Sequence, residues 1–272
     1  QRNGYTMVTI KADIIFGMLK GALCMRSNAV SLPSSSIQNL PDFTLPSRPR
    51  RKKEVRDPYD GLRPWSAITH GIGAVLSAVG TVALLLRSAA LGSALDFWVF
   101  LIYGLSMTGL YTASTLYHCV NTSVAGRIAL RKYDHCSIYL LIAGSYTPIC
   151  MTVLWGGVGG PLLLAIWLCA AAGIVLTIAK LDIPRWLTSA IYLFMGWLAI
   201  FAIVPLHHSL PAAGFAWLLA GGLLYTAGGV LYAAKWPGRN NPRFGCHEIF
   251  HLFILLGSIA HFVMMYTVIA FL

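Results

Sequence analysis

Apolar stretches of about 20 residues, repeated along most of the chain, constrain its fold more than any other feature. A helix of that length crosses the hydrocarbon core of a membrane and makes its backbone hydrogen bonds within itself. The expected spans are Trp65–Leu86, Phe97–Cys119, Tyr133–Leu154, Gly160–Ala179, Trp186–Val204, Ala213–Ala234 and His247–Ala270. The sequence therefore predicts an all-α membrane protein, with a domain of seven transmembrane helices over residues 61–272.

The composition supports a membrane protein. Of the 272 residues, 57% are hydrophobic and 11% are charged, and the mean hydropathy is +0.69. Soluble domains carry about 25% charged residues, so this chain has too few polar side chains to cover a water-soluble globule. We expect it to be a multi-pass protein of the cell membrane.

The net charge of +11 is distributed unevenly among the expected loops. Lys and Arg residues precede the first span and occur in the loops after the second, fourth and sixth spans. In the other loops Arg87 is the only Lys or Arg. Because Lys and Arg are enriched in cytoplasmic loops, the pattern predicts a cytoplasmic N-terminal side and an external C-terminus. This placement beside helix ends also argues against nucleic acid as a partner.

Residues 1–60 differ in composition from the rest of the chain. Met7–Met25 is apolar only in patches, and the following Ser- and Pro-rich stretch ends in a cluster of Arg and Lys. We expect a flexible or interfacial N-terminal extension, whose basic patch lies near anionic lipid. No functional site is expected there.

Five polar residues from three spans are expected at one depth near the cytoplasmic face: Ser114, His118, Asp134, His247 and His251. The second span ends on that side, and the third and seventh spans begin there. His247 and His251 share a helix face because they are four residues apart. Ionisable groups within a membrane are costly and usually functional, so this layer is the candidate site.

The three imidazoles of this layer indicate a metal site. Zinc is commonly bound by three protein ligands with a fourth position left to water, and His118, His247 and His251 are the expected ligands. Asp134 would orient that water or a ligand imidazole, or act as a general base. Ser114 would bind the water or stabilise an oxyanion.

Each of these roles has a structural alternative. The histidines could pair between helices, and Ser114 could serve as a small residue where helices pack. Asp134 could pair with Arg131 or Lys132 and stabilise the helix N-terminus.

The segment His247-Glu248-Ile249-Phe250-His251 also matches the H-E-x-x-H pattern of zinc proteases, in which the Glu is the general base. Glu248 lies on a different helix face from the two histidines, and His118 and Asp134 supply a third ligand and a base without it. We therefore favour the site formed by three spans. No role is assigned to the remaining histidines, which are His70, His135, His207, His208 and His261.

Three motifs occur in order in the bundle. They are Ser114-Thr115-Leu116-Tyr117-His118, then Lys132-Tyr133-Asp134-His135-Cys136-Ser137-Ile138-Tyr139 with Tyr146-Thr147-Pro148, and His247-Glu248-Ile249-Phe250-His251-Leu252. Together they resemble the hemolysin III family, the bacterial branch of the progestin and adipoQ receptors, which include the adiponectin receptors. One departure precedes Thr69-His70-Gly71-Ile72-Gly73, where many relatives carry a Glu and an Asn and this chain has Pro64-Trp65-Ser66.

This resemblance implies a seven-helix receptor-like fold in the bacterial inner, or plasma, membrane. It implies zinc held by His118, His247 and His251, water held by Asp134, and Ser114 as the serine of the Ser-x-x-x-His motif. It also implies a ceramidase-like, zinc-dependent hydrolase of lipid amides or esters, with a ceramide-like or fatty-acyl membrane lipid as substrate.

Two other functions fit the same sequence. In a sensor or receptor, zinc would be a structural clasp that ties the second, third and seventh spans. In a cytolysin, the protein would make membranes leak and would need no metal. A cavity that reaches the site favours the hydrolase, and a sealed site favours the clasp.

Overall fold

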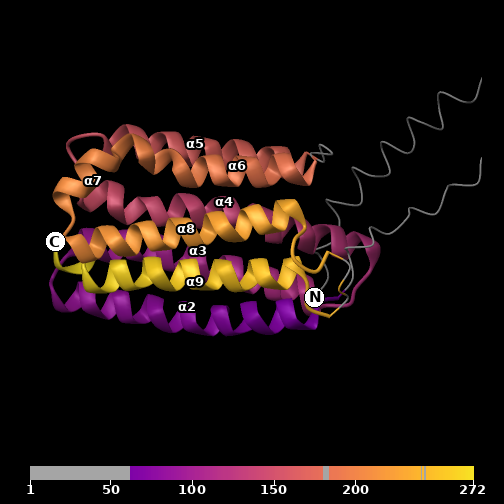
Figure 1. Cartoon of the computed structure of the whole chain (residues 1–272). Coiled ribbons are helices and arrows are strands. Elements are labelled where there is room, and N and C mark those ends of the chain that lie inside the picture. Colours follow the sequence, from indigo (N-terminus) through magenta and orange to yellow (C-terminus); the bar gives the residue numbers. More distant parts are fainter. Residues whose placement is uncertain (1–61, 180–183, 240, 242) are drawn as a thin grey trace, which may run out of the picture. The chain divides into compact units, whose positions relative to one another are not determined.

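Long helices lying side by side form the transmembrane domain in a computed structural model of the chain (Figure 1). The structure describes residues 62–179, 184–239, 241 and 243–272, so the expected N-terminal extension lies outside the described residues. In chain order the elements are α2 Pro64–Ala90, α3 Ala94–Cys119, α4 Val124–Thr152, α5 Gly159–Ile178, α6 Arg185–Trp197, the 3₁₀ segment η2 Leu198–Ala202, α7 Ile203–Ser209, α8 Ala212–Ala234, α9 Cys246–Thr267 and the 3₁₀ segment η3 Ile269–Phe271. The described residues contain no strand.

Six helical stretches are long and apolar enough to cross a membrane, which confirms the all-α membrane class. They are α2, α3, α5, α8, the stretch Trp186–Ser209 and the stretch Cys246–Phe271. The expected third span lies in α4, which is not among the six because its charged first turns and its Ser, Thr and Tyr residues lower its hydropathy. The total of seven spans and the orientation in the membrane stay predictions.

The fifth span is longer than expected. We expected it to end at Val204, which would leave His207 and His208 in the loop that follows, but both residues lie in α7, which continues to Ser209. The helix ends just before Pro211, which is the residue that precedes α8. The two histidines therefore belong to a helix end rather than to a loop.

Helix packing brings distant parts of the chain together. α2 packs against both α3 and α9, α4 packs between α3 and α5, and α8 packs against α9 and α6. At one end of the bundle α2, α4, α6 and α9 begin and α3, α5 and α8 end (Figure 1). We call it the histidine end, because His118, His247 and His251 lie in the helical turns nearest to it.

Close approach of α2 and α3 depends on a glycine. A Cβ atom on Gly73 would lie 2.6 Å from Cδ1 of Tyr111, which is far too close for any side chain. The Tyr111 ring therefore packs directly on the backbone of α2, and its hydroxyl donates to Oγ of Ser258 on α9 at 2.7 Å. This contact joins α2, α3 and α9 in the middle of the bundle.

A hydroxyl from α4 stabilises the break between α6 and α7. Pro205 has no N–H to give to the preceding turn, and the chain adopts the 3₁₀ segment η2 just before it. The Tyr146 hydroxyl accepts the Ala199 N–H at 2.8 Å and donates toward the carbonyls of Met195 and Gly196, at 3.0 and 2.7 Å. It supplies the partners that an irregular backbone needs inside a membrane.

Replacing Tyr146 by Phe should destabilise the bundle. The change leaves the partly buried Ala199 N–H without its acceptor, and the expected loss is about 1–3 kcal/mol of unfolding free energy. Thermal unfolding in detergent measures it, with Tyr133→Phe as the matched control because the Tyr133 side chain is largely exposed. Equal stability of the two variants would show that the hydroxyl does not support the break.

Candidate metal centre

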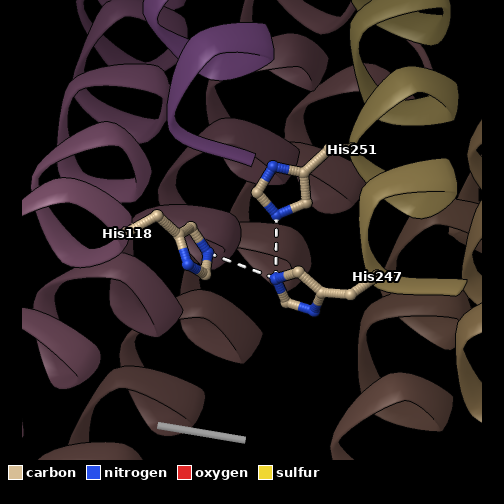
Figure 2. A group of neighbouring side chains, drawn as sticks. All are labelled: His118, His247 and His251. Atoms are coloured by element: carbon tan, nitrogen blue, oxygen red, sulfur yellow. Dashed lines mark hydrogen bonds between the residues drawn. The ribbon is translucent and has the colours of Figure 1, made fainter. Parts of the chain in front are cut away.

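Three imidazole rings from two helices converge at the histidine end. Nε2 of His247 lies 3.2 Å from Nε2 of His118 and 3.1 Å from Nε2 of His251 (Figure 2). His118 extends from α3, and the other two rings extend from successive turns of α9. One nitrogen from each ring lies within 4.8 Å of the other two, so the group could hold a metal ion.

The separations of the nitrogens fit a bound metal as well as hydrogen bonding between the rings. A tetrahedral ion with bonds of 2.0–2.1 Å to nitrogen requires ligand atoms about 3.3 Å apart, close to the separations found here. In a neutral imidazole each nitrogen either donates or accepts. Nε2 of His247 contacts two other Nε2 atoms, so it could serve both only as a shared acceptor. If the three imidazoles bind one cation, each nitrogen gives a lone pair to the ion, and none of them has to act as a hydrogen-bond donor to another.

The end of α3, which carries His118, is held by two arginines. The backbone N–H of Arg63 donates to the carbonyl of His118 at 3.1 Å. The guanidinium of Arg127 is buried, donates to the carbonyls of Tyr117 and Val120, and lies over the Tyr117 ring. The last carbonyls of α3 thus have donors inside the protein, and the backbone at His118 is held in place.

The start of α9 is held by Glu248. Its Oε1 accepts from Nη1 of Arg63 at 2.8 Å and from the Ser66 hydroxyl at 3.3 Å, and its Oε2 accepts from the Gly245 N–H at 2.8 Å. Both carboxylate oxygens are therefore engaged in contacts that tie α9 to the first turn of α2. These contacts argue against the general-base role that the H-E-x-x-H pattern gives this residue.

His70 contacts the cluster, although we assigned it no role from the sequence. Its ring stacks on the His251 ring, with centroids 3.7 Å apart and planes 22° apart, and it meets the Tyr111 ring edge to face. Both His70 nitrogens are buried and have no hydrogen-bond partner among the described residues. Its depth near the start of the first span was visible in the sequence, but the stacking depends on how α2 and α9 face each other.

Of the two remaining residues of the expected site, Asp134 lines the cavity beside the histidines and Ser114 does not. Asp134 lines the same cavity as His118 and His247, outside the group of three nitrogens, and its Oδ2 lies 3.5 Å from Nδ1 of His135. Ser114 is buried on α3 one turn before His118 and is not among the residues that line the cavity. Lys132, considered as a partner of Asp134, donates to the carbonyl of Ile178.

A cavity of about 450 Å³ reaches the histidine cluster from the histidine end. Residues of α3, α4 and α9 line it together with the loop between α8 and α9. His118 and His247 border the cavity, whereas His251 lies deeper, 2% exposed and outside the lining. The cluster is therefore open on one side and closed on the other.

These features define a class: a multi-pass helical membrane protein with a buried three-histidine cluster that could hold a metal ion. Residues 64–262 match the family described as Haemolysin-III related, and the chain belongs to this family. The family predicted from the motifs is thus confirmed.

Similar proteins occur in bacteria and in mammals. The chain is 43% identical over 197 residues to the Hemolysin-3 homolog of Bacillus subtilis (strain 168), covering 72% of this chain and 89% of that protein. It is 40% identical over 193 residues to Hemolysin-3 of Bacillus cereus, covering 71% and 85%. With the monocyte to macrophage differentiation factor of Homo sapiens it shares 28% identity over 200 residues, covering 67% and 79%.

Purified protein should contain roughly one metal ion per chain, since three imidazoles form one ligand set. His118→Ala and His251→Ala should lose most of it, and elemental mass spectrometry measures the content. His207→Ala is the control, because His207 lies in α7 away from the cluster. Metal-free wild-type protein, or full occupancy in both cluster variants, would contradict the assignment.

Glu248→Gln should keep the metal and lose stability. The amide cannot form the ion pair with Arg63, whose loss should lower the unfolding free energy by about 1.5–3 kcal/mol. Metal content and thermal unfolding are measured together, with Asp96→Asn as an acidic control outside the cavity. A variant that loses the metal at unchanged stability would assign Glu248 to metal binding instead.

Proposed function

We propose that the protein is a zinc-dependent hydrolase that cleaves an amide or ester bond of a membrane lipid. The observation that carries the proposal is the cavity that brings His118, His247 and Asp134 to one space at the histidine end. A purely structural metal site has no need of such access. An open position beside three protein ligands is typical of catalytic zinc sites.

Zinc suits this set of ligands. Imidazole is a good ligand for zinc, and three imidazoles leave a fourth position for water or substrate. When bound, zinc polarises a carbonyl oxygen and makes a water molecule more acidic. His118, His247 and His251 would hold the ion, and the stack of His70 on His251 would fix the orientation of that ring.

Asp134 is the proposed general base. Its carboxylate lies in the cavity with two of the three histidines, and it is close to the imidazole of His135. In the proposed reaction Asp134 accepts a proton from the attacking water and passes it to the departing amine or alcohol. Ser114 is proposed to donate its hydroxyl toward the developing oxyanion from the turn before His118.

A lipid substrate fits the location of the cavity. The lining combines residues at the ends of three long helices with aromatic rings, including Tyr117, Tyr232 and Trp186. Aromatic rings of this kind are enriched where the hydrocarbon core meets the headgroups. The wider resemblance to ceramidase-like proteins points to a ceramide-like or fatty-acyl chain.

A structural clasp in a receptor is the second candidate. It is favoured by the burial of His118 and His251, each 2% exposed, and by the way the cluster joins α3 to α9. In that case His247→Ala would lower stability, and no turnover would exist to be lost. A cytolytic function has only the names of the family and of the two Bacillus relatives in its favour.

Asp134→Asn should abolish most hydrolysis while the metal is retained. Loss of a general base typically lowers the rate by about 10²–10⁴-fold. Release of fatty acid from a panel of ceramides and acyl lipids is measured by mass spectrometry on zinc-loaded protein, with Asp96→Asn as the control. No release by the wild type would overturn the proposal, and unchanged release by Asp134→Asn would remove Asp134 from it.

A further inference from the structure

His70 of α2 lies against the histidine cluster but does not contribute to its three nitrogens. The ring is 3% exposed, and its face stacks on the face of His251, with centroids 3.7 Å apart and planes 22° apart. The group that could hold a metal takes one nitrogen from each of the three clustered histidines and none from His70. His70 therefore contacts a candidate ligand through its ring face.

No described hydrogen bond fixes the orientation of the His251 ring from behind. A histidine that binds a metal through one nitrogen almost always donates its other N–H to a carboxylate, a carbonyl or water, and this bond orients the ring. Nε2 of His251 faces the cluster, and its buried Nδ1 makes no hydrogen bond of normal geometry within the described residues. The stack on His70 is the closest ring contact of His251, so it is the contact best placed to orient that ring.

Tyr111 of α3 restricts the position of His70. The two rings meet edge to face, with centroids 5.0 Å apart and planes 88° apart. Gly73 lies three residues beyond His70, on the same side of α2, and a Cβ atom there would lie 2.6 Å from the Tyr111 ring. The Tyr111 ring therefore packs directly on the backbone of α2 beside His70, which limits where the imidazole can move.

Hydrogen bonds to α9 hold Tyr111 in turn. Its hydroxyl donates to Oγ of Ser258 at 2.7 Å and lies 3.3 Å from the carbonyl oxygen of Ile254. Both partners belong to the helix that carries His251, about one and two turns beyond it. The contacts thus form a closed path from His251 to His70, to Tyr111 and back to α9. All three rings of the path are buried.

We propose that His70 and Tyr111 position the His251 ring and thereby set how tightly the cluster holds a metal ion. A ring that is already oriented loses less conformational freedom when the ion binds, so the bound state is more stable. Both are positioning residues, because they act through His251 and do not bind the ion themselves. The inference rests on the metal site within the proposed function, but it does not depend on hydrolysis.

Two apolar replacements of His70 test the role of the ring face. Phe and Leu both remove the imidazole nitrogens, but only Phe keeps a flat aromatic face for the stack. His70→Leu should bind zinc about 10- to 100-fold more weakly than the wild type, the usual effect of losing a residue that supports a ligand, whereas His70→Phe should retain most of the affinity. Affinity is measured on full-length folded protein in detergent, by competition with a zinc chelator. Equal affinities of the two variants would overturn the proposal.

Two tyrosines of α3 test the role of the Tyr111 hydroxyl. Tyr111→Phe removes the bonds to α9 and should weaken zinc binding about 2- to 10-fold, the equivalent of one ordinary hydrogen bond. Tyr103→Phe is the matched control, because Tyr103 is also buried on α3 and its hydroxyl has no hydrogen-bond partner among the described residues. The control should bind zinc as the wild type does. Equal zinc affinity in the two tyrosine variants would overturn the role assigned to Tyr111.

A spectroscopic readout separates positioning from general stability. Cobalt(II) in place of zinc absorbs visible light in a way that depends on the arrangement of its ligands. The cobalt spectrum should change in His70→Leu and stay close to that of the wild type in His70→Phe. If His70→Leu lowered only the unfolding temperature of the metal-free protein and left the spectrum and the zinc affinity unchanged, His70 would have a packing role alone and the proposal would fail.

The binding assays need no turnover, so they separate this inference from the hydrolase. If the zinc affinities follow the predicted order while the wild type cleaves no lipid, the positioning role stands and the hydrolase fails. If the wild type cleaves lipid while His70→Leu and His70→Phe bind zinc equally well, the hydrolase stands and the positioning role fails.

Discussion

Arg63 connects the two helices on which the histidine cluster depends. Its backbone N–H bonds to the carbonyl of His118 at the end of α3, and its guanidinium pairs with Glu248 at the start of α9. One residue at the start of α2 therefore holds the turns that carry His118 and His247. In a low-dielectric environment such charge-assisted bonds are strong and directional. Arg63 also borders the cavity that leads to the histidines, so this junction lies beside the opening.

Sequence reasoning predicted the depth of the site well, for a simple reason. The direction of each span follows from the order of the spans, so the position of a residue within its span gives its depth. His118, His247 and His251 could be placed in one layer in this way, although more than 120 residues separate the first from the others. Helix class, family and multi-pass character were predicted for similar reasons, because length, hydropathy and motif order are properties of the sequence alone.

What sequence reasoning missed depends on how the helices are rotated about their axes. His70 lay at a suitable depth, but its stacking on His251 requires α2 and α9 to turn particular faces to each other. The contacts of Glu248 with Arg63 and Ser66 join residues more than 180 positions apart. Likewise, the insertion of the Tyr146 hydroxyl at η2 and the left-handed backbone of Lys235 are local geometries. No hydrophobic pattern encodes them.

The division of the ligands between α3 and α9 also has a consequence for biogenesis. During synthesis His118 is made early and enters the membrane in the first half of the bundle, whereas His247 and His251 arrive with the last long helix. The complete ligand set exists only after α9 has docked beside α2 and α3. A metal ion held by these three histidines would therefore be acquired late in assembly, and chains stalled before α9 would lack two of the three side chains needed to hold it. Loading with metal would in this way report that the membrane domain has been completed.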